Sequence, residues 1–311
     1  MASIPEVQIA EGCRAMPVVG LGTAAALDLV KDAALEAMRA GYRHFDSATL
    51  YESEGPLGEA IREALELGIL ASRGDLFVTS KLWCNDAHPD QVLPAIKRSL
   101  CNLQLEYLDL YLVHMPFSTI IKPGTRPYPI NHQDLVRFDM KSVWEAMEEC
   151  KSLGLTKAIG VSNFNQKRLE ELLTTARIPP SVNQVEMNVA WQQKQLTEYC
   201  KSKGIHVTAY SPLGGGTAGN VRDSDMIHDI AVSKGKTAAQ VCLRWVHEQG
   251  VSLVTKSFNK ERMKQNIEIF DWELSDGDRL KISEMPQSRT VILTAMLADK
   301  EGYNPLPEHE L

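Results

Sequence analysis

The 311-residue sequence lacks the features that would point to a membrane or a nucleic acid as a partner. It contains no run of about 18 apolar residues, which a membrane-spanning helix needs. Its first residues have neither the basic nor the apolar region of a signal peptide. No block of lysine and arginine occurs, and the net charge of −7 disfavours binding to nucleic acid or to an anionic membrane. We therefore expect a cytoplasmic protein, a monomer, whose partner is a small molecule.

The six cysteines form neither a disulfide framework nor a metal site. None belongs to a Cys-x-x-Cys pair, and none has a histidine at metal-ligand spacing. Scattered thiols of this kind are typical of a reducing compartment. The expectation is reduced cysteines and no metal.

Short apolar runs alternate with amphipathic segments along most of the chain. The apolar runs predict strands at residues 16–20, 42–45, 76–80, 108–113, 158–161, 182–187, 206–210 and 252–255. The amphipathic segments predict helices at 27–40, 55–67, 89–103, 141–153, 166–175, 194–203, 226–233, 238–249 and 260–267. Eight strand–helix units without a linker or repeat predict one α/β domain over residues 1–311, closed as a (β/α)₈ TIM barrel. Residues 7–17 are expected to form a hairpin that plugs the barrel floor, and residues from 288 onward a substrate loop over the other mouth.

Polar residues follow the predicted strands, where the active site of such a barrel lies. Asp46, Lys81 and His114 each close an apolar run, and Tyr51 lies in the loop after Asp46. A carboxylate, an ammonium, an imidazole and a phenol are the groups of a proton-transfer site. The other strand ends carry Gly22-Thr23, Ser162-Asn163, Gln184, Tyr210-Ser211 and Lys256-Ser257. A single polar strand end is usually loop chemistry, whereas polar groups at all eight ends indicate a site.

These positions belong to longer motifs that resemble the signatures of the aldo-keto reductases over essentially the whole chain. The motifs are Phe45-Asp46-Ser47-Ala48 with Tyr51, Ser80-Lys81-Leu82-Trp83, Leu108–Val113 with His114, Ile159-Gly160-Val161-Ser162-Asn163-Phe164, Asn183-Gln184-Val185-Glu186 and Lys256-Ser257. Other segments, such as Ala190-Trp191-Gln192-Gln193, resemble the plant branch. That branch includes enzymes of the D-galacturonate reductase, chalcone reductase, codeinone reductase and deoxymugineic acid synthase types.

The resemblance implies an NADPH-dependent carbonyl reductase. A carbonyl that accepts hydride gains negative charge on oxygen, which a general acid must relieve. Tyr51 is the expected acid, and Lys81 is expected to lower its pKa from about 10. Asp46 would hold Lys81, and His114 would orient the carbonyl. The bulky apolar ketones of plant specialised metabolism (steroid, alkaloid or polyketide) are the favoured substrates, and D-galacturonate or another sugar aldehyde is the alternative.

The resemblance also assigns the cofactor contacts. Ser162, Asn163 and Gln184 would bind the nicotinamide carboxamide, Tyr210 would stack on the ring, and Ser211 and Leu213 would follow the pyrophosphate. The 2′-phosphate would meet Lys256, Ser257 and Arg262, since a guanidinium binds phosphate bidentately. The remaining expected cofactor contacts are Gly22, Thr23, Asp46, Phe258, Gln265 and Asn266.

The substrate pocket is expected to include Trp83, Met115, Phe117 and Trp191, together with the tail near residues 293–297. Met115 stands where the family usually has tryptophan, which predicts a softer and roomier wall. The glycine-rich segment 214–225 looks shorter than in the relatives, where this stretch covers the cofactor pyrophosphate, so the resemblance implies a reduced affinity for the cofactor.

Three alternative interpretations of the fold or the function compete with a barrel reductase. Gly20-Leu21-Gly22-Thr23-Ala24-Ala25 fits a GxGxxA dinucleotide fingerprint, and Tyr199 with Lys203 fits a YxxxK pair. Eight strand–helix units are more than a Rossmann sheet contains, which disfavours that fold. A Schiff-base lysine at Lys81 or Lys256 would make the barrel an aldolase. A cofactor-binding regulatory subunit with little turnover is the non-enzymatic alternative.

Overall fold

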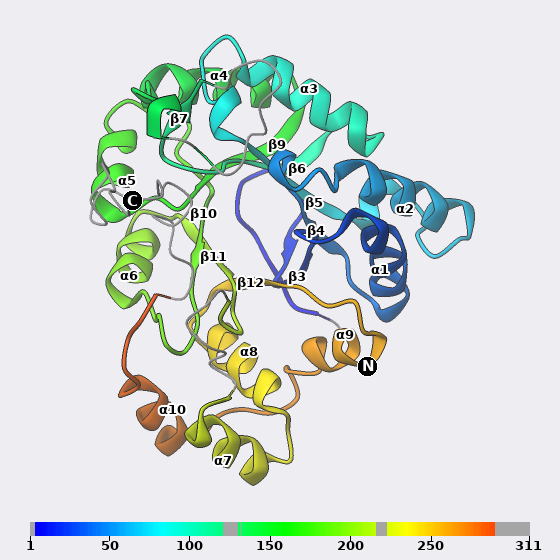
Figure 1. Ribbon diagram of the computed structural model, residues 1–311, viewed down its shortest axis with the longest axis vertical. Helices are drawn as coiled ribbons and strands as arrows, with labels where there is room; N and C mark the ends of the chain where they lie inside the picture. The colour runs from blue at the N-terminus through cyan, green and yellow to red at the C-terminus, as the bar shows by residue number, and fades with distance from the viewer. Residues whose placement is uncertain (1–3, 121–129, 131, 216–222, 290–311) are drawn as a thin grey trace.

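Eight parallel strands form a closed barrel, as the sequence predicted. The computed structural model describes residues 4–120, 130, 132–215 and 223–289. Figure 1 shows the barrel strands at the centre and the helices around them. In order around the barrel, the strands are β3 (Val19–Gly22), β4 (His44–Asp46), β5 (Phe77–Leu82), β6 (Leu108–Val113), β9 (Thr156–Ser162), β10 (Val182–Glu186), β11 (His206–Tyr210) and β12 (Ser252–Thr255), which pairs with β3.

The helices cover the outside of the barrel with their apolar faces. They are α1 (Leu27–Ala40), α2 (Glu54–Glu66), α3 (Val92–Leu103), α4 (Met140–Ser152), α5 (Gln166–Leu173), α6 (Lys194–Ser202), α7 (Asp225–Lys234), α8 (Ala238–Glu248), α9 (Lys260–Ile267) and α10 (Asp276–Ser283). In α1 the residues buried against the barrel include Val30, Ala34 and Met38, spaced as an amphipathic helix requires. Strands β5 and β6 are buried along their whole length, because one face meets the helices and the other faces the barrel interior.

A short hairpin precedes the barrel, as predicted, but the boundary of the first barrel strand was predicted wrongly. β1 (Glu6–Val7) pairs antiparallel with β2 (Met16–Pro17). The predicted strand at residues 16–20 is therefore divided between the hairpin and β3. The apolar run continues through the junction, so hydrophobicity gave no sign of the change in partner.

Gly20 in β3 makes room for a buried histidine of the neighbouring strand. A Cβ atom at Gly20 would lie 2.8 Å from Nδ1 of His44. That Nδ1 atom lies 3.0 Å from the carbonyl oxygen of Pro17, which holds the ring in place. The first glycine of the GxGxxA pattern thus serves barrel packing, and the closed barrel excludes the Rossmann interpretation.

Two segments that the sequence interpretation missed lie near the barrel mouth and after the last barrel helix. β7 (Ser118–Thr119) pairs with β8 (Leu135–Val136), and α10 begins with a capping box between Ser275 and Asp278. Above the mouth, side chains from several loops form an apolar cluster that contains Leu50, Trp83, Cys84, Met115, Phe117, Ile130 and Leu135. This cluster is separate from the main core and forms a fixed wall beside the strand ends.

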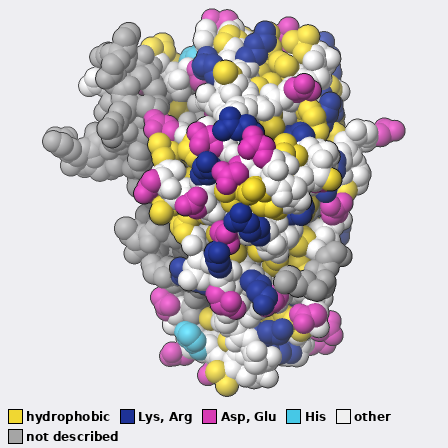
Figure 2. All heavy atoms as spheres, turned by 90° about the vertical axis from the view of Figure 1, so that its right-hand side faces the viewer, with side chains coloured by type: hydrophobic (Ala, Val, Ile, Leu, Met, Phe, Trp, Pro, Cys, Tyr) yellow, Lys and Arg dark blue, Asp and Glu magenta, His cyan; other side chains and the backbone are white. Residues whose placement is uncertain are grey.

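The outer surface carries charges of both signs. On the face shown in Figure 2, lysine and arginine side chains lie among aspartate and glutamate side chains. Ion pairs such as Lys31–Glu63 and Lys260–Glu36 connect α1 with α2 and α9. None of the helices in the described part of the chain is both long and apolar enough to span a membrane.

Candidate active site at the barrel mouth

A fully buried lysine lies at the base of the site. Strand β5 directs Lys81 into the barrel, where its Nζ atom donates to Oδ1 of Asp46 at 2.5 Å and to the carbonyl of Ser47 at 2.9 Å. Asp46 ends β4, the strand paired with β5, so the barrel register brings the two residues together. Burial lowers the pKa of Lys81, and the Asp46 carboxylate opposes this shift. Lys81 and Asp46 form a buried ion pair in which each charge offsets the desolvation cost of the other.

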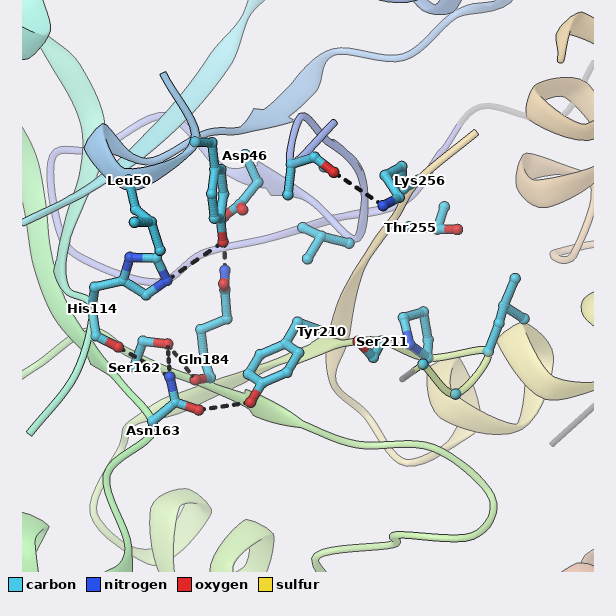
Figure 3. Close-up of a pocket in the computed structure, with 18 of the residues that line it drawn as sticks. Asp46, Leu50, His114, Ser162, Asn163, Gln184, Tyr210, Ser211, Thr255 and Lys256 are labelled. Atoms are coloured by element: carbon cyan, nitrogen blue, oxygen red, sulfur yellow. Dashed lines mark hydrogen bonds between the residues drawn. The ribbon is translucent and has the colours of Figure 1, made fainter. Parts of the chain in front are cut away.

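The Tyr51 hydroxyl and the His114 imidazole converge at one point of the cavity. Tyr51 ends a short 3₁₀ helix (Thr49–Tyr51), and its hydroxyl lies 3.4 Å from Nε2 of His114. The Thr49 hydroxyl donates to the Lys81 carbonyl at 3.1 Å, which fixes this turn above β5. The indole of Trp83 meets the His114 ring edge-on at 5.0 Å between centroids. Both residues line the same cavity, and Figure 3 shows the His114 ring within it.

The expectation that Lys81 lowers the pKa of Tyr51 is wrong for this structure. Burial raises the pKa of the Tyr51 phenol well above its usual value, and the nearby Asp46 carboxylate raises it further. The ammonium lies 5.1 Å from the centre of the Tyr51 ring and is held by Asp46, so its charge is largely balanced. At neutral pH the phenol keeps its proton, which is the form that can donate to a developing alkoxide.

His114 is a neutral imidazole in this site. Burial lowers its pKa well below the usual value, and the Lys81 charge acts in the same direction. Its Nδ1 atom is buried without a hydrogen-bond partner among the described residues. A neutral ring that carries its proton on Nε2 would donate toward the position next to the Tyr51 hydroxyl.

Gln184, Ser162 and Asn163 line the opposite side of the cavity. The Gln184 amide donates to Oδ2 of Asp46 at 2.8 Å, and the Ser162 hydroxyl donates to the Gln184 carbonyl at 2.9 Å. Asn163 adopts a left-handed backbone conformation with φ of 63°, which asparagine tolerates better than most residues. Its side chain donates to the carbonyl of His114 at 3.0 Å and accepts from the Tyr210 hydroxyl at 2.8 Å. This hydrogen-bonded set connects the Lys81–Asp46 pair with His114 and Tyr210.

One cavity of about 450 Å³ contains most of the predicted site residues. Its walls are Gly22, Ala24, Asp46, Leu50, Tyr51, Trp83, His114, Met115, Ser162, Asn163, Gln184, Tyr210, Ser211, Pro212, Leu213, Gly214, Gly215, Val254, Thr255, Lys256 and Arg262. The side near Tyr51 is apolar and aromatic, formed by Leu50, Trp83 and Met115. The side near Lys256 is polar and basic.

A second cavity of about 450 Å³ continues from the first, and Leu213, Lys256 and Arg262 line both. Four further predicted cofactor residues, Ser257, Phe258, Gln265 and Asn266, line it. The sequence interpretation missed five residues from α7, the start of α8 and the chain just before each helix, which are Asp223, His228, Thr237, Ala238 and Ala239. The capping box between Thr237 and Gln240 marked the start of α8, but no local motif linked it to the other cavity residues.

Three predicted site residues lie elsewhere in the described structure. Thr23 is buried, and its hydroxyl contacts the Asp46 carbonyl and the Ser53 hydroxyl. Phe117 packs within the apolar cluster behind Met115. Trp191 lines a separate cavity together with Gln287. Residues 293–297 and most of the segment 214–225 lie outside the described residues.

The two joined cavities fit the elongated shape and the charge of a phosphorylated dinucleotide. A neutral amide and hydroxyl set lies at the end near Tyr51, and Lys256 and Arg262 lie along the other half. The Lys256 ammonium donates to the carbonyl of Ala24 at 3.0 Å, which holds it across the groove between the ends of β12 and β3. Arg262 offers donors suited to a phosphate. No group of three or more potential metal-ligating side chains occurs within the described ranges.

Comparisons with known proteins agree with this architecture. The model of the aldo/keto reductase family matches residues 19–285. Deoxymugineic acid synthase 1-D of Triticum aestivum is 52% identical over 300 residues, which cover 94% of this chain and 95% of the relative. D-Galacturonate reductase of Fragaria ananassa is 53% identical over 308 residues, which cover 96% of each chain. The crystal structure of a Bombyx mori aldo-keto reductase in complex with NADP has a TM-score of 0.86 at 34% identity, covering 95% of this chain and 97% of that chain.

Proposed function

The chain belongs to the aldo/keto reductase family, and from that premise we propose that it is an NADPH-dependent carbonyl reductase with Tyr51 as the proton donor. The observation that carries the proposal is the convergence of the Tyr51 hydroxyl and His114 Nε2 at 3.4 Å, in a cavity backed by the Lys81–Asp46 pair. A carbonyl oxygen beside both groups would accept one hydrogen bond from each. The bound cofactor supplies the hydride.

The proposal assigns a chemical role to each group of residues in the site. Tyr51 transfers its proton to the oxygen as negative charge develops there. His114, being neutral, donates a hydrogen bond and orients the carbonyl without competing for the proton. Lys81 and Asp46 hold the turn that carries Tyr51, through the Ser47 carbonyl and the Thr49 hydroxyl. Ser162, Asn163, Gln184 and Tyr210 would hold the nicotinamide end, while Lys256 and Arg262 would bind the 2′-phosphate.

The wall of the cavity near Tyr51 supports the proposed substrate class. Leu50, Trp83 and Met115 present apolar surface there, and Lys256 and Arg262 lie in the cofactor half. This arrangement favours a bulky apolar ketone of plant specialised metabolism. The 53% identity to a D-galacturonate reductase supports the second candidate, a sugar acid or sugar aldehyde.

NADPH oxidation with a panel of carbonyl compounds tests this function. The panel contains a generic aldehyde, D-galacturonate, and steroid or alkaloid ketones, each compared by kcat/KM. A higher value for the ketones supports the apolar substrate class, and a higher value for D-galacturonate supports the sugar-acid class. NADPH binding without turnover of any compound would instead favour the cofactor-binding regulatory role. Borohydride trapping of a substrate adduct on Lys81 or Lys256 would favour the aldolase.

A cytoplasmic monomer remains part of the proposal. Size-exclusion chromatography with light scattering tests the monomer, and a fluorescent fusion tests the location.

A further inference from the structure

An ion pair between a partly exposed arginine and a buried glutamate joins the segment after α10 to the rim of the barrel. The Nε atom of Arg289 lies 3.7 Å from Oε2 of Glu186, whose side chain is fully buried. Arg289 is itself only 24% exposed. Two hydrogen bonds fasten the preceding residues to the loop after β10. The backbone amide of Ser288 donates to the Ala190 carbonyl at 2.7 Å. The backbone amide of Gln192 donates to the side-chain oxygen of Gln287 at 2.7 Å. The chain just before Arg289 is therefore fastened beside the end of β10.

The pair lies directly beside the cavity wall that Tyr210 forms. Glu186 follows Gln184 by two residues on β10, so both side chains point to the same face of the strand. Gln184 lines the cavity, and Glu186 is paired in register with Tyr210. Burial is the main cause of the raised pKa of the Tyr210 phenol; the Glu186 carboxylate raises this pKa further and Arg289 opposes the increase, so both charges act on the phenol. Figure 3 shows the Tyr210 ring facing the cavity, with its hydroxyl bonded to Asn163.

A carboxylate at this place has an electrostatic effect on any ring that lies against Tyr210. The oxidised nicotinamide ring carries a positive charge and the reduced ring carries none. A buried negative charge nearby therefore favours the oxidised cofactor, and a guanidinium beside that charge opposes the effect. The Lys81 ammonium is paired with Asp46 and therefore does not neutralise the Glu186 carboxylate in place of Arg289.

We propose that Arg289 is a positioning residue that balances the charge of Glu186 and so sets the relative affinity of the site for NADPH and NADP⁺. This inference rests on the proposed function. Without Arg289 the site would hold NADP⁺ more tightly relative to NADPH, which would slow release of the oxidised cofactor. The contact thus links the C-terminal segment to the cofactor preference through charge, without contact with the reacting atoms.

Cofactor titrations followed by tryptophan fluorescence test the proposal. The quantity compared is the ratio of the dissociation constant for NADP⁺ to that for NADPH. Arg289→Met should lower this ratio by about fivefold to fifteenfold, as one unit charge does across roughly 10 Å at an effective dielectric constant of about 20 to 40. Glu186→Gln should raise it. The double variant should return the ratio close to the wild-type value, and Arg289→Lys should preserve it.

A matched control separates this effect from general destabilisation. Arg279 pairs with the largely buried Glu248 at 2.9 Å, in the same C-terminal region but away from the cavity. Arg279→Met should leave the ratio unchanged. Equal weakening of both cofactors in Arg289→Met, or a double variant that stays as altered as Arg289→Met, would overturn the proposal. Failure of the wild-type protein to bind either cofactor would overturn the proposed function, and this inference with it.

Discussion

The Nζ atom of Lys81 lies 2.5 Å from Oδ1 of Asp46, and neither side chain is more than 4% exposed. Two charges this deeply buried are stable only as a pair, because each pays a desolvation cost that the other offsets. Gln184 donates to the second oxygen of Asp46 and thereby completes the bonding of the carboxylate. The base of the site is a buried hydrogen-bonded unit that draws on three strands, β4, β5 and β10.

Removing the carboxylate should therefore reduce stability as well as turnover. Asp46→Asn leaves the Lys81 ammonium buried without an anion, and we expect the free energy of unfolding to fall by about 3–5 kcal/mol. Urea denaturation measures the change. Glu63→Gln, which removes an exposed partner of Lys31, is the control and should change stability little. Equal effects of the two substitutions would contradict a buried, mutually dependent pair.

Gly20 and Gly22 should respond differently to alanine. A Cβ at Gly20 would meet the His44 ring at 2.8 Å, whereas the nearest atom to a Cβ at Gly22 is the Thr255 carbonyl oxygen at 3.7 Å. Gly20→Ala should lower the free energy of unfolding by about 1–3 kcal/mol through overpacking. Gly22→Ala should be tolerated by the fold. Thermal unfolding distinguishes them, and the reverse order would refute this account of the first glycine.

Stability should decline in acid because of a partly buried histidine on β11, His206. Burial lowers the pKa of His206 to about 4, and the charge of His44 acts in the same direction. The unfolded chain takes up a proton near pH 6.5 that the folded chain accepts only near pH 4. Neutral His206 therefore makes its full contribution to the free energy of unfolding above pH 6.5. As the pH falls from 6.5 to 4, this contribution decreases by about 3 kcal/mol.

Denaturation curves at pH 7.5 and pH 5 measure this dependence. His206→Gln should show a smaller loss between the two values than the wild type does. The remaining loss would come from the other histidines whose pKa is lowered by burial, which are His44, His114 and His247. An unchanged pH dependence in His206→Gln would show that this histidine is not the cause.

The two basic residues that line both cavities should make the site bind NADPH more tightly than NADH. Lys256→Ala and Arg262→Ala each remove a cation that lines the groove. Both variants should weaken NADPH far more than NADH, because only NADPH carries the 2′-phosphate. Fluorescence titration with each cofactor gives the comparison. A similar loss for NADPH and NADH would assign these residues to another part of the cofactor.

The sequence predicted the barrel well because its information was periodic. Eight apolar runs and the amphipathic helices between them follow directly from burial on both faces of the strands. The first strand was misplaced because residues 16–22 form one apolar run that serves two sheets. The two-residue strands β7 and β8 were too short to show any period.

The site was predictable in its residue types and less so in its contacts. The strand-end positions brought Asp46, Lys81 and His114 together, as barrel geometry requires. The direction of the Tyr51 pKa shift was missed, because it depends on burial and on how closely Asp46 binds the ammonium. The positions of Trp191 and Phe117 depend on loop conformations that no local pattern encodes.

The most direct test of the central claim is the activity of Tyr51→Phe. This change removes only the hydroxyl that lies 3.4 Å from His114 and keeps the ring beside Lys81. NADPH oxidation with the best carbonyl substrate and NADPH binding by fluorescence are measured on the same preparation. The account predicts turnover reduced by at least about a hundredfold, as for loss of a general acid, with NADPH affinity close to wild type. Turnover near the wild-type rate would contradict the assignment of Tyr51 as the proton donor.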